Sequence, residues 1–240
     1  MLDLIGSIVG MSTIGIVLVA FTQALPGTPA RRVTLAAIAG GWVGLASALA
    51  AAGKLAFAPE NPVPLVGVLF ALPLLVVGVL ALSSEKTRVA LLAVPMQVLI
   101  GVHSLRLLGV LFLALAAVGR LSGPFPYFAG IGDIITAAIA IPLALKVARS
   151  GQLSWRVVRR WNIFGALDLV VAVGLGILSA GGSPVQLIHA GVGSEAMQYL
   201  PYSLVPTVLV PFYLITHGIV AAQVAAARRV KGVLPHAIAT

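Results

Sequence analysis

Residues 94–120, VPMQVLIGVHSLRLLGVLFLALAAVGR, are apolar over nearly their whole length, yet His103 and Arg106 interrupt them. An apolar run of more than about 18 residues is typical of a helix that spans a membrane. The two polar residues are three positions apart, so a helix places them on one face. An arginine inside a membrane is costly unless it faces protein, water or an opposite charge. The rest of the chain must therefore supply a partner for Arg106.

The composition is that of a multi-span integral membrane protein. Of the 240 residues, 60% are hydrophobic and 9% are charged, and the mean hydropathy is +1.12. The pI near 10.9 would indicate nucleic acid binding in a soluble chain, but here the basic residues lie between apolar runs, where membrane topology explains them and predicts no nucleic acid partner. The absence of cysteine excludes disulfides, thiolate metal sites and catalytic thiols.

Seven apolar stretches predict an all-α integral membrane protein, a bundle of seven transmembrane helices in a single domain over residues 1–240. Only Asp3 precedes the first stretch, whereas a secretory signal would carry basic residues there, so we expect a retained helix. In the fourth stretch, the residues before Pro95 could form an interfacial turn. The expected spans are 4–25, 33–53, 63–82, 89–119, 127–147, 161–180 and 202–226.

The lysines and arginines lie almost entirely on one side of the predicted bundle, and only Lys54 and Arg120 fall on the other. Cytoplasmic loops are enriched in these residues, so we expect the N-terminus outside and the C-terminus in the cytoplasm. An alanine-, glycine- and valine-rich composition with few lysines is typical of a GC-rich bacterial genome, and this predicts the inner membrane. The expected cytoplasmic residues are Arg31, Arg32, Lys86, Arg88, Lys146, Arg149, Arg156, Arg159, Arg160, Arg228, Arg229 and Lys231.

Aromatic residues near the ends of the spans are expected at the two membrane interfaces, where amphipathic rings are enriched. Trp155 and Trp161 are assigned to the cytoplasmic interface. The residues assigned to the outer interface are Phe125, Tyr127, Tyr199 and Tyr202.

Five ionisable side chains are expected inside the membrane. From the cytoplasmic end of their spans, His103 lies roughly 14 Å deep, Arg106 roughly 18 Å, Asp168 roughly 11–14 Å and His217 roughly 14 Å. Asp133 lies roughly 9–12 Å below the outer face, above the others. Four ionisable residues from three spans thus share one slab, and we expect the fourth, sixth and seventh spans to meet there.

This set predicts an intramembrane site for a ligand, an ion or a proton relay, in which Arg106 pairs with Asp133, Asp168 or both. One arginine cannot neutralise two carboxylates, so with both histidines neutral the cluster carries a net charge of −1 unless it holds a proton or a cation. We therefore expect one aspartate to be protonated at neutral pH, with Asp168 favoured by depth as the ionised partner of Arg106. The alternative is a purely structural pair that locks helices together.

Two further segments have a predicted role. Pro211, in the seventh span, frees the carbonyl of Thr207, and such breaks often line cavities. The external segment 183–201, which contains His189 and Glu195, could form an amphipathic lid, although a mobile surface loop is the simpler interpretation. Small residues before each carboxylate, as in Gly132-Asp133, allow a partner helix to approach closely.

Three function classes follow from the predicted site. The first is a small-solute or ion/proton-coupled transporter. The second is a haem-binding redox protein with His103 and His217 as axial ligands on facing helices, a chemically sufficient pair. The third is a membrane-embedded enzyme or ligand sensor. No catalytic motif and no metal site is recognised, and no cofactor is assigned. The expected partners are the lipid bilayer and a small-molecule or ion ligand.

Overall fold

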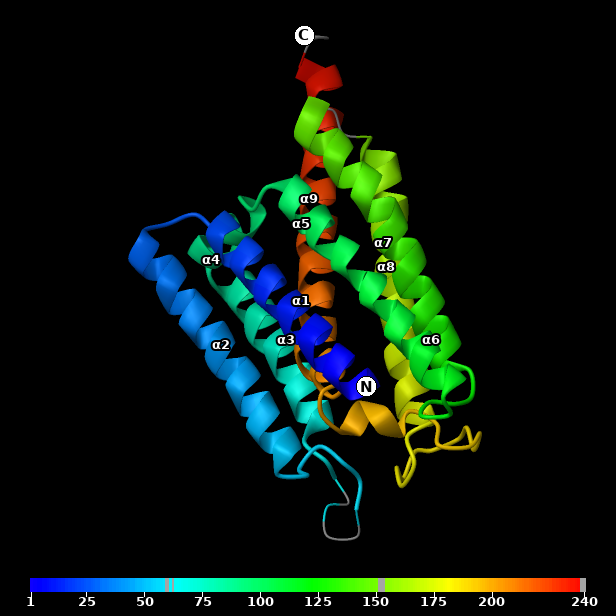
Figure 1. The fold of residues 1–240 in the computed structure, drawn as a ribbon. Coiled ribbons are helices and arrows are strands. Elements are labelled where there is room, and N and C mark those ends of the chain that lie inside the picture. The colour runs from blue at the N-terminus through cyan, green and yellow to red at the C-terminus, as the bar shows by residue number, and fades with distance from the viewer. Residues whose placement is uncertain (59–60, 62, 151–153, 238–240) are drawn as a thin grey trace.

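The computed structural model describes residues 1–58, 61, 63–150 and 154–237. These residues form helices joined by loops, with no β-strand among them. Seven of the helices in this described part are long and apolar enough to cross a membrane. The predicted all-α, seven-helix architecture is confirmed at this level (Figure 1).

The first part of the chain forms α1 (Leu2–Ala24), α2 (Pro29–Ala51) and α3 (Val66–Ser83). The side chain of Thr28 caps α2 by accepting a hydrogen bond from the Arg31 backbone nitrogen, and Pro29 follows in the first turn. Both features favour the start of a helix at this point.

The fourth span differs from the prediction in its limits and its winding. Residues expected in the span belong to a separate helix, α4 (Glu85–Leu92), because Pro95 cannot continue the hydrogen-bond pattern. The span itself consists of α5 (Met96–Gly101), η1 (Val102–Gly109) and α6 (Val110–Ala117). Its central segment η1 is a 3₁₀ helix of eight residues, longer than the three or four that are usual.

The second part of the chain contains the long helices α7 (Phe125–Ser150), α8 (Trp155–Leu178) and α9 (Val210–Ala237). A short 3₁₀ helix, η2 (Glu195–Gln198), lies in the segment before the last span, which begins with a π-helical turn, η3 (Val205–Leu209). The last span, Val205–Ala227, is the central one, because 61% of its apolar window is buried, against 6% for α3 at the edge.

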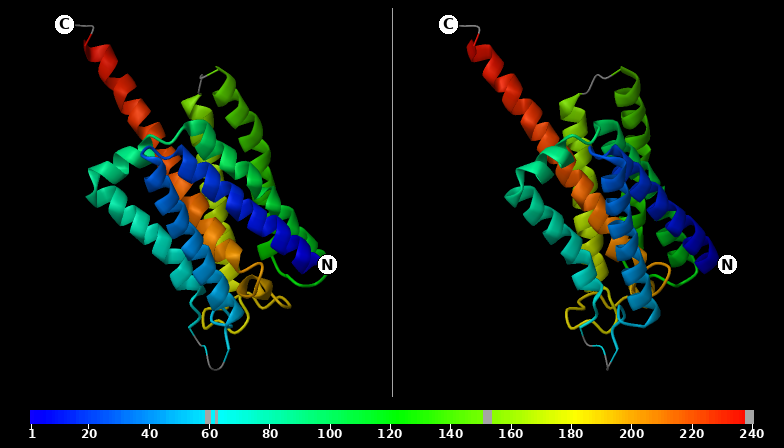
Figure 2. Two further views of the ribbon diagram at one scale, coloured as in Figure 1. Left: turned by 60° about the vertical axis from the view of Figure 1, so that its left-hand side comes forward. Right: turned by 90° about the vertical axis from the view of Figure 1, so that its left-hand side faces the viewer.

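The start of α1 and the end of α9 lie at opposite ends of the bundle (Figures 1 and 2). The loops that follow α2, α6 and α8 gather at the end where α1 begins. The turn into α2, with Arg31 and Arg32, and helix α4, with Lys86 and Arg88, lie at the opposite end. The basic residues are therefore segregated along the bundle as expected, although the side chains of Arg228, Arg229 and Lys231 lie outside the described part.

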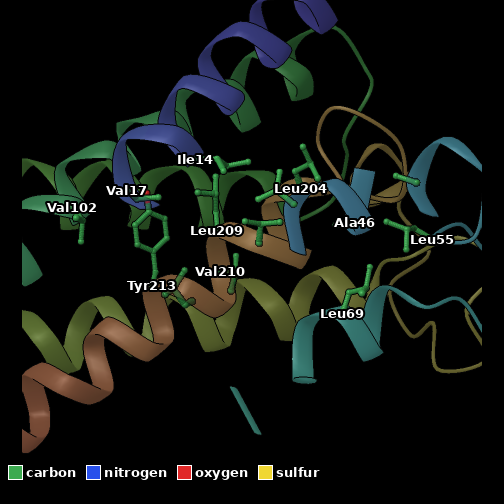
Figure 3. Packing of buried hydrophobic residues seen from close by; sticks show 14 residues of the cluster. Ile14, Val17, Ala46, Leu55, Leu69, Val102, Leu204, Leu209, Val210 and Tyr213 are labelled. Atoms are coloured by element: carbon green, nitrogen blue, oxygen red, sulfur yellow. The ribbon is translucent and has the colours of Figure 1, made fainter. Parts of the chain in front are cut away.

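Two packed apolar clusters contact the polar residues in the middle of the bundle. The first includes Ile14, Leu69, Val208 and Tyr213, and joins α1, α2 and α3 to the start of the last span (Figure 3). The second surrounds Trp161, together with Leu99, Ile100, Val158 and Val220. The rings of Tyr213 and Trp161 both contact His103, with ring centroids 5.1 Å and 5.2 Å away. The two clusters therefore enclose the polar residues between them.

The assignment of Trp161 to the membrane interface is wrong. The side chain is buried, and its Nε1 donates a hydrogen bond to the Thr136 carbonyl of α7 over 3.0 Å. Helix α8 begins at Trp155 rather than at Trp161, so six residues, about 9 Å of helix, precede the ring. Among the residues expected at the outer interface, Phe125 and Tyr202 are buried against other helices, whereas Tyr127 and Tyr199 are exposed.

Candidate functional site

Arg106 is the centre of the candidate site and bridges two carboxylates from different helices. Its Nε donates to Asp133 Oδ1 of α7 over 2.6 Å, and its Nη2 donates to Asp168 Oδ2 of α8 over 2.5 Å. The arginine residue is 1% exposed. The two carboxylates approach from opposite-running neighbouring helices, so the single cation links α7 and α8 through η1.

The remaining guanidinium nitrogen also has partners. Arg106 Nη1 donates to the Gly165 carbonyl over 3.1 Å and lies 3.3 Å from His217 Nε2. The guanidinium carbon lies 5.8 Å from the centre of the Tyr213 ring. All three nitrogens of the arginine are thus occupied by groups from α7, α8 and α9.

The hydrogen bonds of His217 define its tautomer. Arginine can only donate, so Nε2 must accept from Arg106 and carries no proton. The other nitrogen, Nδ1, lies 2.8 Å from Asn162 Oδ1, an acceptor, and therefore carries the proton. The Asn162 amide nitrogen donates to the His217 carbonyl over 3.2 Å, which sets the orientation of the amide. His217 is therefore a neutral imidazole in this network.

His103 lies beside His217, with ring centroids 4.1 Å apart. Its Nε2 is 3.0 Å from the Thr216 hydroxyl, which itself lies 2.9 Å from the Tyr213 carbonyl. Its Nδ1 has no hydrogen-bond partner among the described residues. A charged imidazolium stacked on His217 beside Arg106 would be repelled, so this histidine also adds no positive charge to the cluster.

Glycines allow the helices to approach closely enough for these contacts. A Cβ on Gly109 would lie 2.6 Å from Asp133 Cβ and 2.8 Å from the Gly130 carbonyl oxygen. A Cβ on Gly165 would lie 2.8 Å from the His217 ring, and one on Gly132 would overlap Asp168 Oδ1. Real Cβ atoms do not tolerate such distances, so the predicted role of small residues beside the carboxylates holds for the packing of η1, α7, α8 and α9.

The 3₁₀ winding of η1 aligns the residues that face the site. Side chains three positions apart are eclipsed in a 3₁₀ helix, which places His103, Arg106 and Gly109 in one row. All three are buried, whereas Leu107 and Val110 on another row are exposed. The 3₁₀ winding therefore places residues three positions apart in a straight row, so that His103 and Arg106 face the site from the same side of η1.

The start of the last span carries the other irregular winding. Residues Val205–Leu209 form a π-helical turn that ends two residues before Pro211. The Thr207 carbonyl accepts a hydrogen bond from Trp42 Nε1 of α2 over 3.0 Å. A neighbouring span thus satisfies the carbonyl that was predicted to be freed by the proline.

A cavity of about 360 Å³ extends from the site toward the end of the bundle that carries the α2–α3 and α8–α9 loops. Its walls are mostly apolar and come from α3, α7, α8 and the start of the last span. Asp133 is the only charged side chain among the described residues that line it. The cavity therefore brings one carboxylate of the site to a space of ligand size.

The predicted lid or surface loop, residues 183–201, packs on this end of the bundle. Met197 and Gln198 are buried and line the cavity, and Gln198 Oε1 accepts a hydrogen bond from the Phe57 backbone nitrogen over 2.9 Å. The Ser194 backbone nitrogen donates to the Ser179 carbonyl over 3.2 Å. The segment is therefore a surface loop that is partly buried, with Met197 and Gln198 packed inward and His189 exposed, and its mobility stays a prediction.

Residues 63–225 match the model of a family described as a domain of unknown function, DUF8737. The chain belongs to this family. No curated protein and no solved structure matches it. The DUF8737 match begins just before α3 and ends within α9, so it includes every residue of the polar cluster and nearly all of the cavity lining.

Within the DUF8737 region, the structure brings all five predicted site residues into one connected cluster. It also adds residues that were not predicted. One of them, Asn162, precedes Gly165 and the predicted residue Asp168 at intervals of three on α8, and this spacing could have indicated a shared face. Thr216 and Tyr213 had no comparable signal, because both types are common in apolar spans.

The polar cluster around Arg106 does not provide a site for haem between His103 and His217. Their rings are in contact, which leaves no space for a porphyrin, and both nitrogens of His217 already have partners. The described residues also contain no group of three histidine, aspartate or glutamate side chains that could hold a metal ion. The arrangement is instead suited to holding a proton or a positively charged group, as the charges of the cluster indicate.

Proposed function

We propose that the chain is a multi-pass protein of the bacterial inner membrane that transports a small solute or ion, coupled to protons, through the Arg106–Asp133–Asp168 cluster. One observation carries the proposal: a buried arginine contacts two carboxylates, and one of these lines a cavity of ligand size. Intramembrane ionisable residues that face a cavity are typical of proton and solute pathways.

The charge balance supports a proton-carrying role. Arg106 contributes one positive charge, the two aspartates contribute two negative charges when ionised, and the neutral histidines contribute none. A net charge of −1 in a low-dielectric interior is unfavourable, so a proton or a cation completes the resting state. A purely structural link of η1 to α7 and α8 uses both carboxylates, but it does not account for the excess negative charge that they carry when both are ionised.

Asp133 is the better candidate for the carboxylate that exchanges its proton. Its side chain is 15% exposed and lines the cavity, whereas the side chain of Asp168 is 9% exposed. A solute in the cavity would therefore meet Asp133 first. This assignment keeps Asp168 as the ionised partner of Arg106.

The direction of the cavity follows from the proposed topology. Arg31, Arg32, Lys86 and Arg88 lie at the end of the bundle opposite the cavity loops. The positive-inside rule places this basic end in the cytoplasm. The N-terminus and the cavity are then on the outer side, where a solute could enter from the periplasm.

Infrared difference spectroscopy tests the protonated carboxylate directly. In purified protein titrated from about pH 5 to pH 9, the wild type should show a protonated-carboxyl band that is missing in Asp133→Asn and retained in the matched variant Asp3→Asn. A wild-type protein without this band, or a band that persists in Asp133→Asn, contradicts the assigned proton site.

Proteoliposomes test transport. With a pH-sensitive dye inside the vesicles and an imposed proton gradient, a panel of organic cations, amino acids and sugars is added in turn. At least one solute should accelerate proton movement in the wild type and in Asp3→Asn, but not in Asp133→Asn. If solute enters at the same rate with and without a proton gradient, the coupling is wrong.

A further inference from the structure

We propose that the cavity beside the DUF8737 polar cluster binds an amphipathic organic cation: a compact apolar body with one ammonium-type group, which pairs with Asp133. This inference specifies the substrate class and rests on the proposed transport function. It is carried by the shape of the cavity, the charge at its base and an unused polar group in its lining.

The walls of the cavity favour an apolar body. Helices α3 and α8 both pack against the last span, and they form facing walls without extensive contact with each other. Aromatic rings contribute to the lining through Phe57, Phe70, Phe112 and Phe125. At about 360 Å³, the space lies within the size range of pockets that bind small organic molecules.

The depth of the cavity can be followed along α7. Phe125, Ala129 and Asp133 line it at intervals of four, so they form one row over about 12 Å of helix. The charged member of this row is at the deep end, beside Arg106. A ligand that fills the cavity therefore has its apolar part along the row and one polar end at Asp133.

The charge at that end selects a cation. Arg106 is shared between Asp133 and Asp168, so the three groups carry one excess negative charge when both aspartates are ionised. An ammonium group supplies the missing positive charge and up to three hydrogen-bond donors. An anionic ligand would be repelled, and a bare metal ion would lack the several oxygen ligands that it requires.

The lining also contains an unused hydrogen-bond donor. Gln198 is 6% exposed and lines the cavity, and its Nε2 has no hydrogen-bond partner among the described residues. Its Oε1 is held by the Phe57 backbone nitrogen, which leaves the amide N–H groups as the available part. Buried donors without partners are rare in proteins, and a ligand with an acceptor distant from its ammonium group would satisfy this one.

Three probes with the same apolar body test the charge preference: 4-phenylbutylamine, 4-phenylbutanol and 4-phenylbutyrate. Equilibrium dialysis against the protein in nanodiscs at neutral pH measures their affinities, and empty nanodiscs provide the background for partition into lipid. The amine should bind at least about tenfold more tightly than the alcohol, as expected for a charge-assisted hydrogen bond, and the carboxylate should not bind above background.

Two variants separate the contributions of charge and shape. Asp133→Asn should lower the affinity for the amine to that for the alcohol, and Asp3→Asn should leave all affinities unchanged. Ala172→Trp, which fills the cavity but keeps both aspartates, should abolish binding of amine and alcohol alike. If Asp133→Asn does not fold, the Ala172→Trp variant and the amine-to-alcohol ratio of the wild type still decide the proposal.

The outcomes distinguish this inference from the transport proposal. Preference for the amine without proton-coupled flux would support the binding site and overturn transport. Proton-coupled flux of another solute with no preference for the amine would overturn the substrate class alone. Equal binding of amine and alcohol would assign the cavity to a neutral apolar molecule such as a lipid tail, and no binding of any probe would also overturn the inference.

Discussion

The chain contains two arginine–aspartate contacts of similar length in very different surroundings. Arg106 lies 2.5–2.6 Å from its two carboxylates with a side chain that is 0% exposed. Arg120 Nη1 lies 2.5 Å from Asp3 Oδ1, and these side chains are 39% and 59% exposed. The hydrogen bond that Arg120 donates to Asp3 raises the pKa of the Arg120 guanidinium. The distances are nearly equal, but the two contacts contribute differently to stability because one is buried and the other is exposed.

The comparison teaches that burial and partner number, rather than distance, distinguish the two contacts. The exposed contact joins one cation to one anion, and solvent screens it. The buried contact joins one cation to two anions. Loss of the cation leaves two carboxylates in the protein interior with neither a positive partner nor solvent. The buried contact of Arg106 with two carboxylates has an excess negative charge that a proton or a cation can balance. The exposed Arg120–Asp3 pair has no such excess.

The largest expected effect is that of Arg106→Ala. Removing one member of a buried ion pair costs about 3–5 kcal/mol, so we expect severe loss of thermal stability in detergent or of accumulation in the membrane. Arg106→Lys should be less damaging, because it keeps the charge but loses the planar guanidinium whose separate nitrogens contact the two carboxylates. Arg120→Ala is the matched control. Equal melting temperatures for Arg106→Ala and Arg120→Ala would remove the distinction between the two contacts.

The next effect tests the close approach that brings Asp168 to Arg106. A Cβ at Gly132 would overlap Asp168 Oδ1, whereas a Cβ at Gly174 meets no atom within 4 Å. Gly132→Ala should therefore destabilise the protein by about 1–3 kcal/mol through overpacking, and Gly174→Ala should be neutral or slightly stabilising. Thermal unfolding in detergent measures both. A Gly132→Ala protein as stable as Gly174→Ala would show that the helices can separate without cost.

A smaller effect is expected when only one carboxylate is neutralised. Asp133→Asn and Asp168→Asn each leave one arginine–carboxylate pair intact, so each should cost less than Arg106→Ala. The double variant leaves Arg106 without an anion and should be as unstable as Arg106→Ala. Melting temperatures of the four proteins provide the test. Additive effects of the two single variants would mean that the carboxylates do not share Arg106.

The smallest effect is that of Asp3→Asn. An exposed pair contributes at most about 1 kcal/mol, and this contribution decreases as salt screens the charges. The difference in melting temperature from the wild type should be small at low salt and vanish at high salt. A large difference that does not depend on salt would show that Asp3 has a structural role beyond its charge, for example in fixing the start of α1.

Much of the fold was predictable because the bilayer imposes a length and a polarity on each span. The seven apolar stretches were located from the apolar runs along the sequence, and their limits differ from the observed helices by a few residues in most cases. The fourth span was the exception, because the effect of Pro95 on the preceding apolar residues depends on how α4 packs. The buried position of Trp161 was missed for a similar reason: helix α8 extends into the basic segment before it.

The residues that form the site could be predicted from the sequence, but the contacts between them could not. Depth along each span brought His103, Arg106, Asp168 and His217 together, since a helix has a constant rise per residue. Depth does not give rotation, and so the sequence could not decide between one and two carboxylates at Arg106. The 3₁₀ winding of η1 has no signal in its residue types, because the same residues are compatible with an α-helix.

That winding also links the position of the charge to the length of the fourth span. Eight residues measure about 16 Å as a 3₁₀ helix and about 12 Å as an α-helix. Rewinding η1 would shorten the span by about 4 Å and swing Arg106 through about 60° relative to His103. Arg106 would then leave the row that faces α7 and α8, and α5 and α6 would be drawn together. The length of η1 and the direction of Arg106 are therefore coupled: a change in the distance between the ends of η1 also rotates Arg106 relative to Asp133 and Asp168.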